Sequence, residues 1–336
     1  MLADTYILSL GHFHPKTVLK NSFFDDLDIG SSSDWIEERT GIVARRTVLE
    51  PESIFALSRG HATLGQLRAE GKVTTIAELS EAAWVLLRER YPDLDPNSIE
   101  ALICGTSIPD FDIPANASTI AARLGLSCLS FDVNSACSSF VTDLHVARNL
   151  IRAGAHNTIA IVNPERYSLR CDYTDKNSCV LFGDGCSAAL LSSTPRPGAL
   201  KLLDTFVASD PSGYDLVKVP DAGTFSQNGK AVQKFAITRT IEATETILTR
   251  NGLTPKDVRY FTGHQANLRM ISSAAERLGI TEDRHLHNVQ ELGNQGAAGA
   301  PSVLSMHWDT FQTGDLIVMA VVGSGLTWGS ALFQRV

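Results

Sequence analysis

Three residues in this sequence, a cysteine, a histidine and an asparagine, could together carry out thiol chemistry. Cys137 stands where an expected strand ends and a helical pattern begins, and a thiol at a helix N-terminus meets unpaired N–H groups that favour the thiolate. His264 directly follows a short strand, and Asn294 lies in a Gly/Ala-rich segment that lets backbones approach closely. Each is also typical of ordinary structure, as a buried thiol, a structural histidine or a turn residue. Because sites gather at the strand ends of parallel sheets, the three together predict a nucleophilic site.

A papain-like cysteine protease is the alternative that the same residue order suggests. The intervals from Cys137 to His264 and Asn294 are near those of such proteases. However, Cys137 lacks the Cys-Gly-Ser/Ala-Cys-Trp/Tyr context, and nothing marks residues 1–136 as a removable pro-segment. An internally duplicated α/β chain also differs from that fold, so the sequence disfavours the protease hypothesis.

The elements that must position these residues repeat along the chain. Residues 99–126 run as a strand, a loop and a helix ending in Ala-Ala-Arg-Leu-Gly-Leu, and residues 259–280 run the same way, ending in Ala-Glu-Arg-Leu-Gly-Ile. Gly183–Leu190 also resembles Gly325–Leu332. We therefore predict two similar α/β halves, residues 1–195 with the cysteine and residues 196–336 with the histidine and the asparagine.

Short β-branched runs alternate with helical patterns in both halves, which predicts mostly parallel sheets covered on both faces. Strands are expected at residues 159–162 and 316–322. Helices are expected at residues 140–153 and 237–250, from apolar residues at three- and four-residue spacing. Residues 55–90 are expected to form a helical insertion, an excursion from the repeated strand and helix pattern, which glycines interrupt.

Composition and charge exclude several classes of function. The 336 residues are 43% hydrophobic and carry a net charge of −8, which predicts a globular protein that does not bind nucleic acid. The N-terminus has neither the basic nor the apolar region of a signal peptide. Leu316–Gln334 is uncharged over 19 residues, about the length of a bilayer span, but its glycines predict two buried strands. No membrane partner is therefore expected.

The cysteines show no CxxC pair and no spacing typical of zinc ligands, so no metal site is expected. Without an export signal, we expect them to be reduced thiols in a cytoplasmic protein. The question is then whether any one of the six is reactive. They are Cys104, Cys128, Cys137, Cys171, Cys179 and Cys186.

Several motifs resemble the β-ketoacyl-acyl carrier protein synthase III family of the thiolase superfamily. The resemblance runs from about residue 31 to the C-terminus in the order of the family's motifs, so it covers nearly the whole chain. It implies the five-layered αβαβα thiolase fold, a homodimer, and no cofactor beyond thioesters of coenzyme A or phosphopantetheine. The motifs are Ser33–Ile36, Arg39–Ile42, Ser135-Ala136-Cys137, Phe182–Gly185, Gly263–Arg269, Gly293-Asn294 and Gly325–Leu332.

The resemblance implies a decarboxylative condensation in two stages. Cys137 would accept an acyl group from acyl-CoA or an acyl carrier protein, and a malonyl or β-ketoacyl thioester would then supply the attacking carbanion. His264 and Asn294 would donate hydrogen bonds to the charge that builds on the thioester oxygen. The backbone N–H groups of Cys137 and Ser324 would hold the oxyanion at the acyl carbonyl.

Binding residues also follow from the resemblance. Trp35 and Arg170 would flank the adenine of coenzyme A, and Arg269 would meet the acidic carrier protein. Ile113 would stand at the end of the acyl tunnel, where the family often has phenylalanine. The remaining residues that would line the CoA arm are Arg39, Asn228, Gly229 and Asn267.

Departures from the family pattern leave the substrate open. They are Ile113, the Ser138-Ser139 pair after the cysteine, and the excursion at residues 55–90. The resemblance fits either an initiator of fatty-acid synthesis that uses short acyl-CoA or a polyketide-type ketosynthase of specialised metabolism. Two further alternatives are a non-condensing acyltransferase on the same fold and a protein that only binds acyl thioesters. The intact set of Cys137, His264 and Asn294 favours condensation over both.

Overall fold

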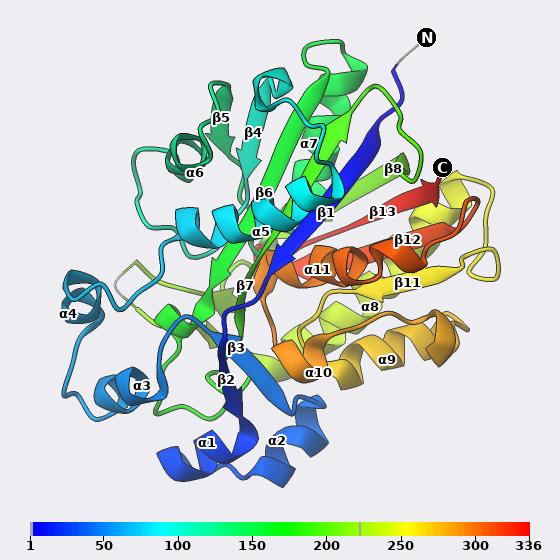
Figure 1. Ribbon diagram of the computed structural model, residues 1–336. Coiled ribbons are helices and arrows are strands. Elements are labelled where there is room, and N and C mark those ends of the chain that lie inside the picture. Colours follow the sequence, from blue (N-terminus) through cyan, green and yellow to red (C-terminus); the bar gives the residue numbers. More distant parts are fainter. Residues whose placement is uncertain (1–2, 222) are drawn as a thin grey trace.

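A nine-stranded sheet runs through the computed structural model, which describes residues 3–221 and 223–336 (Figure 1). Its strand order is β11-β12-β13-β8-β1-β7-β6-β4-β5, and β2-β3 and β9-β10 form two small sheets. The strands are β1 Tyr6–Phe13, β2 Thr17–Lys20, β3 Ala44–Thr47, β4 Ala101–Cys104, β5 Leu129–Asp132, β6 Thr158–Arg166, β7 Asp184–Ser192, β8 Leu200–Ser209, β9 Val217–Lys218, β10 Ser226–Gln227, β11 Tyr260–Gly263, β12 Leu316–Gly323 and β13 Thr327–Arg335. The helices are α1 Asn21–Leu27, α2 Ser33–Thr40, α3 Pro51–Ser58, α4 Leu64–Ala69, α5 Ile76–Arg90, α6 Asn116–Leu124, α7 Ser139–Arg152, α8 Gly229–Arg250, α9 Leu268–Arg277, α10 Val289–Leu292 and α11 Gly299–Met306.

The two halves of the sheet have the same topology. The N-terminal half has the order β1-β7-β6-β4-β5, and the C-terminal half has the order β8-β13-β12-β11 followed by a parallel bridge from Phe261 to His285. The first strands of the two halves, β1 and β8, pair with each other through Tyr6 and Ile7. The repeat seen in the sequence is therefore a repeat of strand order.

The expectation of mostly parallel sheets is wrong. The pairs β4·β5, β4·β6 and β11·β12 are parallel, whereas β1·β7, β1·β8, β6·β7, β12·β13 and β8·β13 are antiparallel. In each half the last strand returns beside the preceding one without a crossover helix, and it separates the parallel strands from the first strand. Antiparallel neighbours need no crossover helix, so alternation of strands and helices alone did not reveal them.

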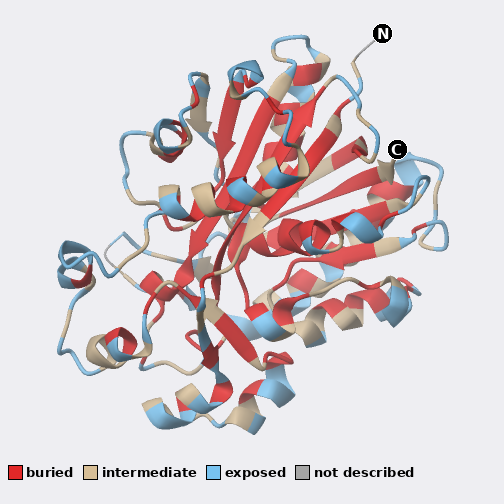
Figure 2. Cartoon of the chain, in the orientation of Figure 1, coloured by how far each residue is buried: buried red, intermediate tan, exposed pale blue. Residues whose placement is uncertain are grey.

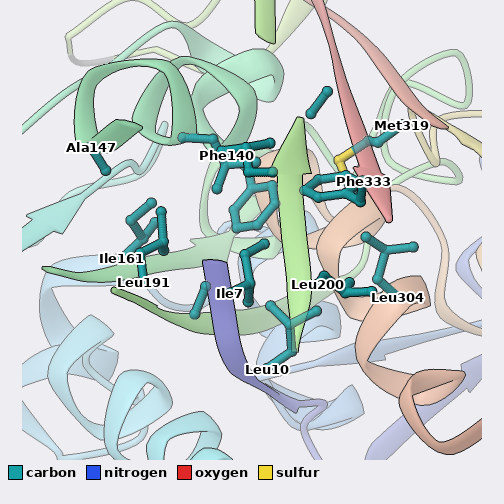
Figure 3. Packing of buried hydrophobic residues seen from close by; sticks show 14 of the residues in the cluster. Ile7, Leu10, Phe140, Ala147, Ile161, Leu191, Leu200, Leu304, Met319 and Phe333 are labelled. Atoms are coloured by element: carbon teal, nitrogen blue, oxygen red, sulfur yellow. The ribbon is translucent and has the colours of Figure 1, made fainter. Parts of the chain in front are cut away.

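Helices α7 and α11 lie between the two halves of the sheet, and the other large helices cover its outer faces. Phe140 and Ala147 of α7 and Leu304 of α11 pack with Ile7 and Phe333 from strands of both halves (Figure 3). Helices α5 and α6 pack on the outer face of the N-terminal half, and α8 and α9 pack on that of the C-terminal half. The large sheet is buried along most of its length (Figure 2). The result is five alternating layers.

Residues 55–90 form parts of three helices with different surroundings. Leu79, Ala83 and Leu87 of α5 are fully buried against the sheet, so α5 belongs to an outer layer. By contrast, α3 and α4 lie away from the large sheet, at the left margin of Figure 1. The excursion is therefore confined to α3, α4 and the loops around them.

The uncharged stretch Leu316–Gln334 forms β12 and β13, which pair antiparallel from Leu316 with Gln334 to Gly323 with Thr327. Most of their side chains are buried in the sheet, as the glycines in the stretch indicated. Within residues 3–221 and 223–336, no helix has the length and apolar character needed to cross a membrane.

Candidate active site

Cys137 lies at a sharp turn between β5 and α7. It is the middle residue of the 3₁₀ turn Ala136–Ser138, and α7 begins at Ser139. Ala136 adopts a left-handed conformation with φ 51°, which is costly for a residue with a side chain. The Ser139 hydroxyl holds the turn, since it accepts a hydrogen bond of 3.0 Å from the N–H of Ser135 and donates one of 2.7 Å to the carbonyl of Ala136. The strand-to-helix position predicted for the thiol is confirmed.

The N–H of Cys137 lowers the pKa of the thiol, as expected at a helix start, but burial acts more strongly in the opposite direction. Burial raises the pKa of the Cys137 thiol to about 12, and the nearby Glu165 carboxylate acts in the same direction. The Tyr167 hydroxyl, 3.6 Å from the sulfur, acts the opposite way. Desolvation outweighs the field of the helix end here. Cys137 therefore rests as a neutral thiol and must lose its proton during attack.

His264 follows β11 and is only 7% exposed. Burial lowers the pKa of its imidazole to about 4, so the ring is neutral at physiological pH. Its Nδ1 is buried and has no hydrogen-bond partner among the residues that the structure describes. A neutral imidazole can either accept the thiol proton or donate from Nε2.

Asn294 is oriented by its own loop. The N–H of Gly296 donates to Asn294 Oδ1 at 3.0 Å, which leaves the Nδ2 amide group as the donor for a ligand. The loop lies against the N-terminal half, where the N–H of Asn294 donates to Leu181 O at 2.8 Å and that of Gly183 donates to Asn294 O at 3.0 Å. Gly183 permits this approach, because a Cβ there would overlap the carbonyl of Leu292. The close approach expected from the glycines is confirmed.

The end of β12 brings Ser324 to the cysteine turn. Gly323 lies so close that a Cβ would stand 2.7 Å from Ser135 O and 2.8 Å from Ser138 N. The hydroxyl of Thr327 also lies 2.7 Å from that of Ser138. His264 lines a small cavity with Val322 of the same strand. The turn of Cys137 also contacts the turn Gly296–Ala298, which follows Asn294, so the segments of Cys137, His264, Asn294 and Ser324 lie together between the halves.

Trp35 of α2 has two cations over its ring. The Arg39 guanidinium lies 5.0 Å and the Lys176 ammonium 5.2 Å from the ring centroid. Arg170 instead donates hydrogen bonds to the carbonyls of Asp221 and Gly223, at 2.7 and 3.1 Å. Lys176 is thus a further cation at the Trp35 ring, and the flanking of adenine by Trp35 and Arg170 stays a prediction.

The other expected binding residues lie on three separate elements. Asn267 donates from its amide to Arg39 O at 3.2 Å, and Arg269 donates to Glu38 O at 3.2 Å, so both connect the start of α9 to α2. Asn228 caps α8, where its side chain accepts from Ala231 N at 3.4 Å, and Gly229 is the first residue of that helix.

Ile113 is not buried in an acyl tunnel of its own chain. Its side chain is 87% exposed, and the neighbouring Phe111 is 53% exposed. Ile113 can therefore stand at the end of an acyl tunnel only if a surface from outside this chain covers it.

Sequence reasoning missed two polar residues near the thiol, Glu165 and Tyr167. Glu165 is fully buried and accepts hydrogen bonds from the N–H and hydroxyl of Ser107 and from the N–H of Ala297. Burial raises the pKa of Glu165 to about 8. Tyr167 follows it two residues later and stacks on Phe182 with ring centroids 4.5 Å apart. A charged pair, Glu165-Arg166, at the end of an otherwise apolar strand was the signal that could have found them.

Comparisons with known proteins find relatives along nearly the whole chain. The family model described as 3-oxoacyl-[acyl-carrier-protein (ACP)] synthase III matches residues 131–211, and that of its C terminal matches residues 248–335. A β-ketoacyl-[acyl-carrier-protein] synthase III of Aliarcobacter butzleri is 33% identical over 345 residues, with 97% of this chain and 96% of the relative covered. One of Paracoccus denitrificans is 33% identical over 337 residues, with 96% and 97% covered.

Solved structures show the same likeness. A 3-oxoacyl-[acyl-carrier-protein] synthase III from Aquifex aeolicus aligns with a TM-score of 0.86 at 28% identity, over 98% of this chain and 99% of the other. The priming β-ketosynthase from the R1128 polyketide biosynthetic pathway aligns with a TM-score of 0.84 at 26% identity, over 99% and 97%. The expected thiolase-like fold of two repeated halves is thereby confirmed. The chain belongs to the 3-oxoacyl-[acyl-carrier-protein] synthase III family.

Proposed function

We propose that this protein is a ketosynthase that condenses an acyl thioester with a malonyl or β-ketoacyl thioester through an acyl-Cys137 intermediate, in fatty-acid or polyketide biosynthesis. The observation that carries the proposal is the pair of neutral donors. His264 is uncharged because of its burial, and Asn294 is held with its amide nitrogen free of the loop. Neutral donors stabilise a developing enolate without binding the substrate carboxylate as an ion pair.

The first stage transfers the acyl group to Cys137. The sulfur attacks the thioester carbonyl, its proton passes to the neutral His264, and the N–H groups of Cys137 and Ser324 stabilise the oxyanion. Collapse of the oxyanion breaks the bond between carbon and the thiol of the donor, which leaves with the proton. Because its pKa is about 12, the thiol must lose its proton during attack, and His264 speeds this transfer, which water would perform more slowly in its absence.

The second stage forms the carbon–carbon bond. The malonyl thioester loses CO2, and the negative charge moves to its thioester oxygen, where Nε2 of His264 and Nδ2 of Asn294 donate hydrogen bonds. The carbanion attacks the acyl carbonyl, the bond to sulfur breaks, and Cys137 takes up a proton. A β-ketoacyl extender that is already a carbon nucleophile would use the same two donors.

The proposed partners are coenzyme A thioesters and an acyl carrier protein. Trp35, Arg39 and Lys176 offer an aromatic face and two cations to a nucleotide, and Arg269 offers a charge to an acidic carrier. All six cysteines are free thiols, which supports a reducing compartment such as the cytoplasm.

We also propose a homodimer that completes the acyl pocket. The sheet ends at β5, whose outer edge is unpaired among the described residues, and Leu129 on this strand is 53% exposed. Phe111 and Ile113 add exposed apolar surface. A second copy of the chain would cover this edge and place Ile113 in the partner's acyl pocket.

The test is the intact mass of the protein after mixing with acyl-CoAs from acetyl to long and β-keto chains. We expect an acyl adduct that Cys137→Ala abolishes, and its chain length distinguishes an initiator from a specialised ketosynthase. His264→Ala should still acylate slowly but should not decarboxylate malonyl thioester. The absence of an adduct from any CoA or carrier-bound donor would overturn the proposal.

A further inference from the structure

A second group of chemically active side chains lies on the segment that runs from the end of α9 back to α10 (Figure 1). Each of Glu282, His285 and His287 offers one ligand atom within 4.8 Å of those of the other two. His287 Nε2 lies 2.9 Å from Glu282 Oε1, and His285 Nδ1 lies 3.9 Å from Glu282 Oε2. One carboxylate thus faces both imidazoles.

The imidazoles carry nitrogen atoms that the protein does not satisfy. His285 is 4% exposed, and both of its ring nitrogens are buried without a hydrogen-bond partner among the described residues. Nδ1 of His287 is also buried and unpaired among the described residues, but Nε2 is the atom of that ring that faces Glu282. Buried polar atoms are normally paired, so the unpaired His285 Nδ1 that faces Glu282 marks a place where a ligand can bind.

We propose that Glu282, His285 and His287 form a site for one divalent transition-metal ion of the zinc type. Zinc binds histidine nitrogen at about 2.0–2.1 Å and carboxylate oxygen at about 2.0–2.2 Å, so tetrahedral ligands stand roughly 3.4 Å apart. The separations of 2.9 and 3.9 Å, each to a different oxygen of Glu282, are close to that value, so the carboxylate would bind the ion between the two rings. Two imidazoles and one carboxylate suit zinc, cobalt or nickel rather than calcium or magnesium. A water molecule would complete the coordination.

The ion would act on the segment that supports the proposed active site. Gln265, the neighbour of His264, accepts hydrogen bonds from the N–H groups of Asn288 at 2.9 Å and Val289 at 3.2 Å. These residues directly follow His287, so an ion bound at Glu282, His285 and His287 would fix the chain that leads into this contact. An ion that binds the folded chain but not the unfolded chain would raise the Tm of the protein.

The test uses the full chain, freed of metal with a chelator and titrated with Co²⁺ and with Zn²⁺. We expect one equivalent of Co²⁺ to give the intense visible bands of four-coordinate cobalt, and Zn²⁺ to displace it and raise the Tm. Glu282→Gln and His287→Ala should each weaken binding by at least about tenfold, the lower end of what loss of even an outer-shell partner costs. Glu282 has a side chain that is 76% exposed, so its replacement leaves the fold intact.

The matched control is His156→Ala. It removes another histidine beside a carboxylate, with Nδ1 of His156 3.7 Å from Glu100, and leaves the proposed ligands untouched. Binding that is unchanged in this control but lost in Glu282→Gln supports the site. Binding that persists equally in Glu282→Gln and His287→Ala, a thiolate-to-cobalt band in the near ultraviolet, or no binding at all would overturn it.

Discussion

Tyr167 holds its hydroxyl 3.6 Å from the sulfur of Cys137, and this contact lowers the pKa of a thiol that burial has raised to about 12. We predict that Tyr167→Phe reduces the thiolate population about tenfold, because a hydrogen bond to a charged group contributes about 1.5–3 kcal/mol and sulfur is a weak acceptor. The rate of Cys137 alkylation by iodoacetamide, followed by mass spectrometry, measures this. The Phe ring keeps the stacking on Phe182. An unchanged rate would show that the hydroxyl does not stabilise the thiolate.

Glu165 makes the stability of the protein depend on pH. Burial raises its pKa to about 8 in the folded state, whereas the unfolded carboxyl titrates near its ordinary value of 4.5. Between these values the folded state binds more protons than the unfolded state, so stability falls as pH rises from about 5 to 8. We predict that Glu165→Gln flattens this fall, although its amide fits the donors of Ser107 and Ala297 less well. Urea denaturation at several pH values measures the slope, and equal slopes in both proteins would contradict the prediction.

Residue types and spacing predicted Cys137, His264 and Asn294 as candidates but did not predict their protonation. The neutral thiol follows from burial against Glu165, which lies in another element, so local sequence could not predict it. The contact of Lys176 with Trp35 has the same origin. Lys176 and Arg170 lie in one irregular stretch, and only the folded loop shows which of them reaches Trp35.

At the scale of elements, the loop of Asn294 packs directly onto the strand that carries Glu165. Gly296 has φ 54°, and a Cβ there would stand 2.6 Å from the ring of Tyr167 and 2.8 Å from Glu165 Oε1. We predict that Gly296→Ala costs about 1–2 kcal/mol for its left-handed backbone and about 1–3 kcal/mol more for overlap, with loss of condensation. Thermal unfolding and a decarboxylation assay measure the two effects.

Gly252→Ala is the control for that substitution. Gly252 has φ 69°, but nothing lies within 4 Å of its added Cβ, so only the backbone cost applies. Equal losses of stability in the two variants would show that crowding at Gly296 is unimportant.

Periodicity predicted α7 within one residue at each end, but it missed the first turns of α8, which begins at Gly229 rather than at Ile237. A capping side chain, Asn228, starts this helix, and apolar spacing does not register a cap.

At the scale of the whole molecule, the duplicated sequence predicted the duplicated strand order but not how the halves join. The β1·β8 pairing and the contact between Gly183 and the loop of Asn294 are long-range, and no local pattern encodes them. The β1·β8 pairing joins the two halves into one continuous sheet, and β5 is the edge strand on the side of the N-terminal half. An unpaired edge with exposed apolar residues is a template for association, so the fold itself motivates the proposed dimer.

We predict that Leu129→Asp on β5 and Ile113→Asp each convert the protein from a dimer into a monomer of 36.3 kDa, because a carboxylate buried at the contact would lack a partner. Light scattering coupled to size-exclusion chromatography, at several protein concentrations, measures the mass. Val18→Asp is the control, since Val18 is 41% exposed on β2, in a separate small sheet. Because Ile113 would line the partner's acyl pocket, dissociation should also shift or abolish the preference among acyl-CoAs. A wild-type mass equal to one chain, or a dimer that survives both substitutions, would refute this assembly and leave the acyl pocket to be sought within a single chain.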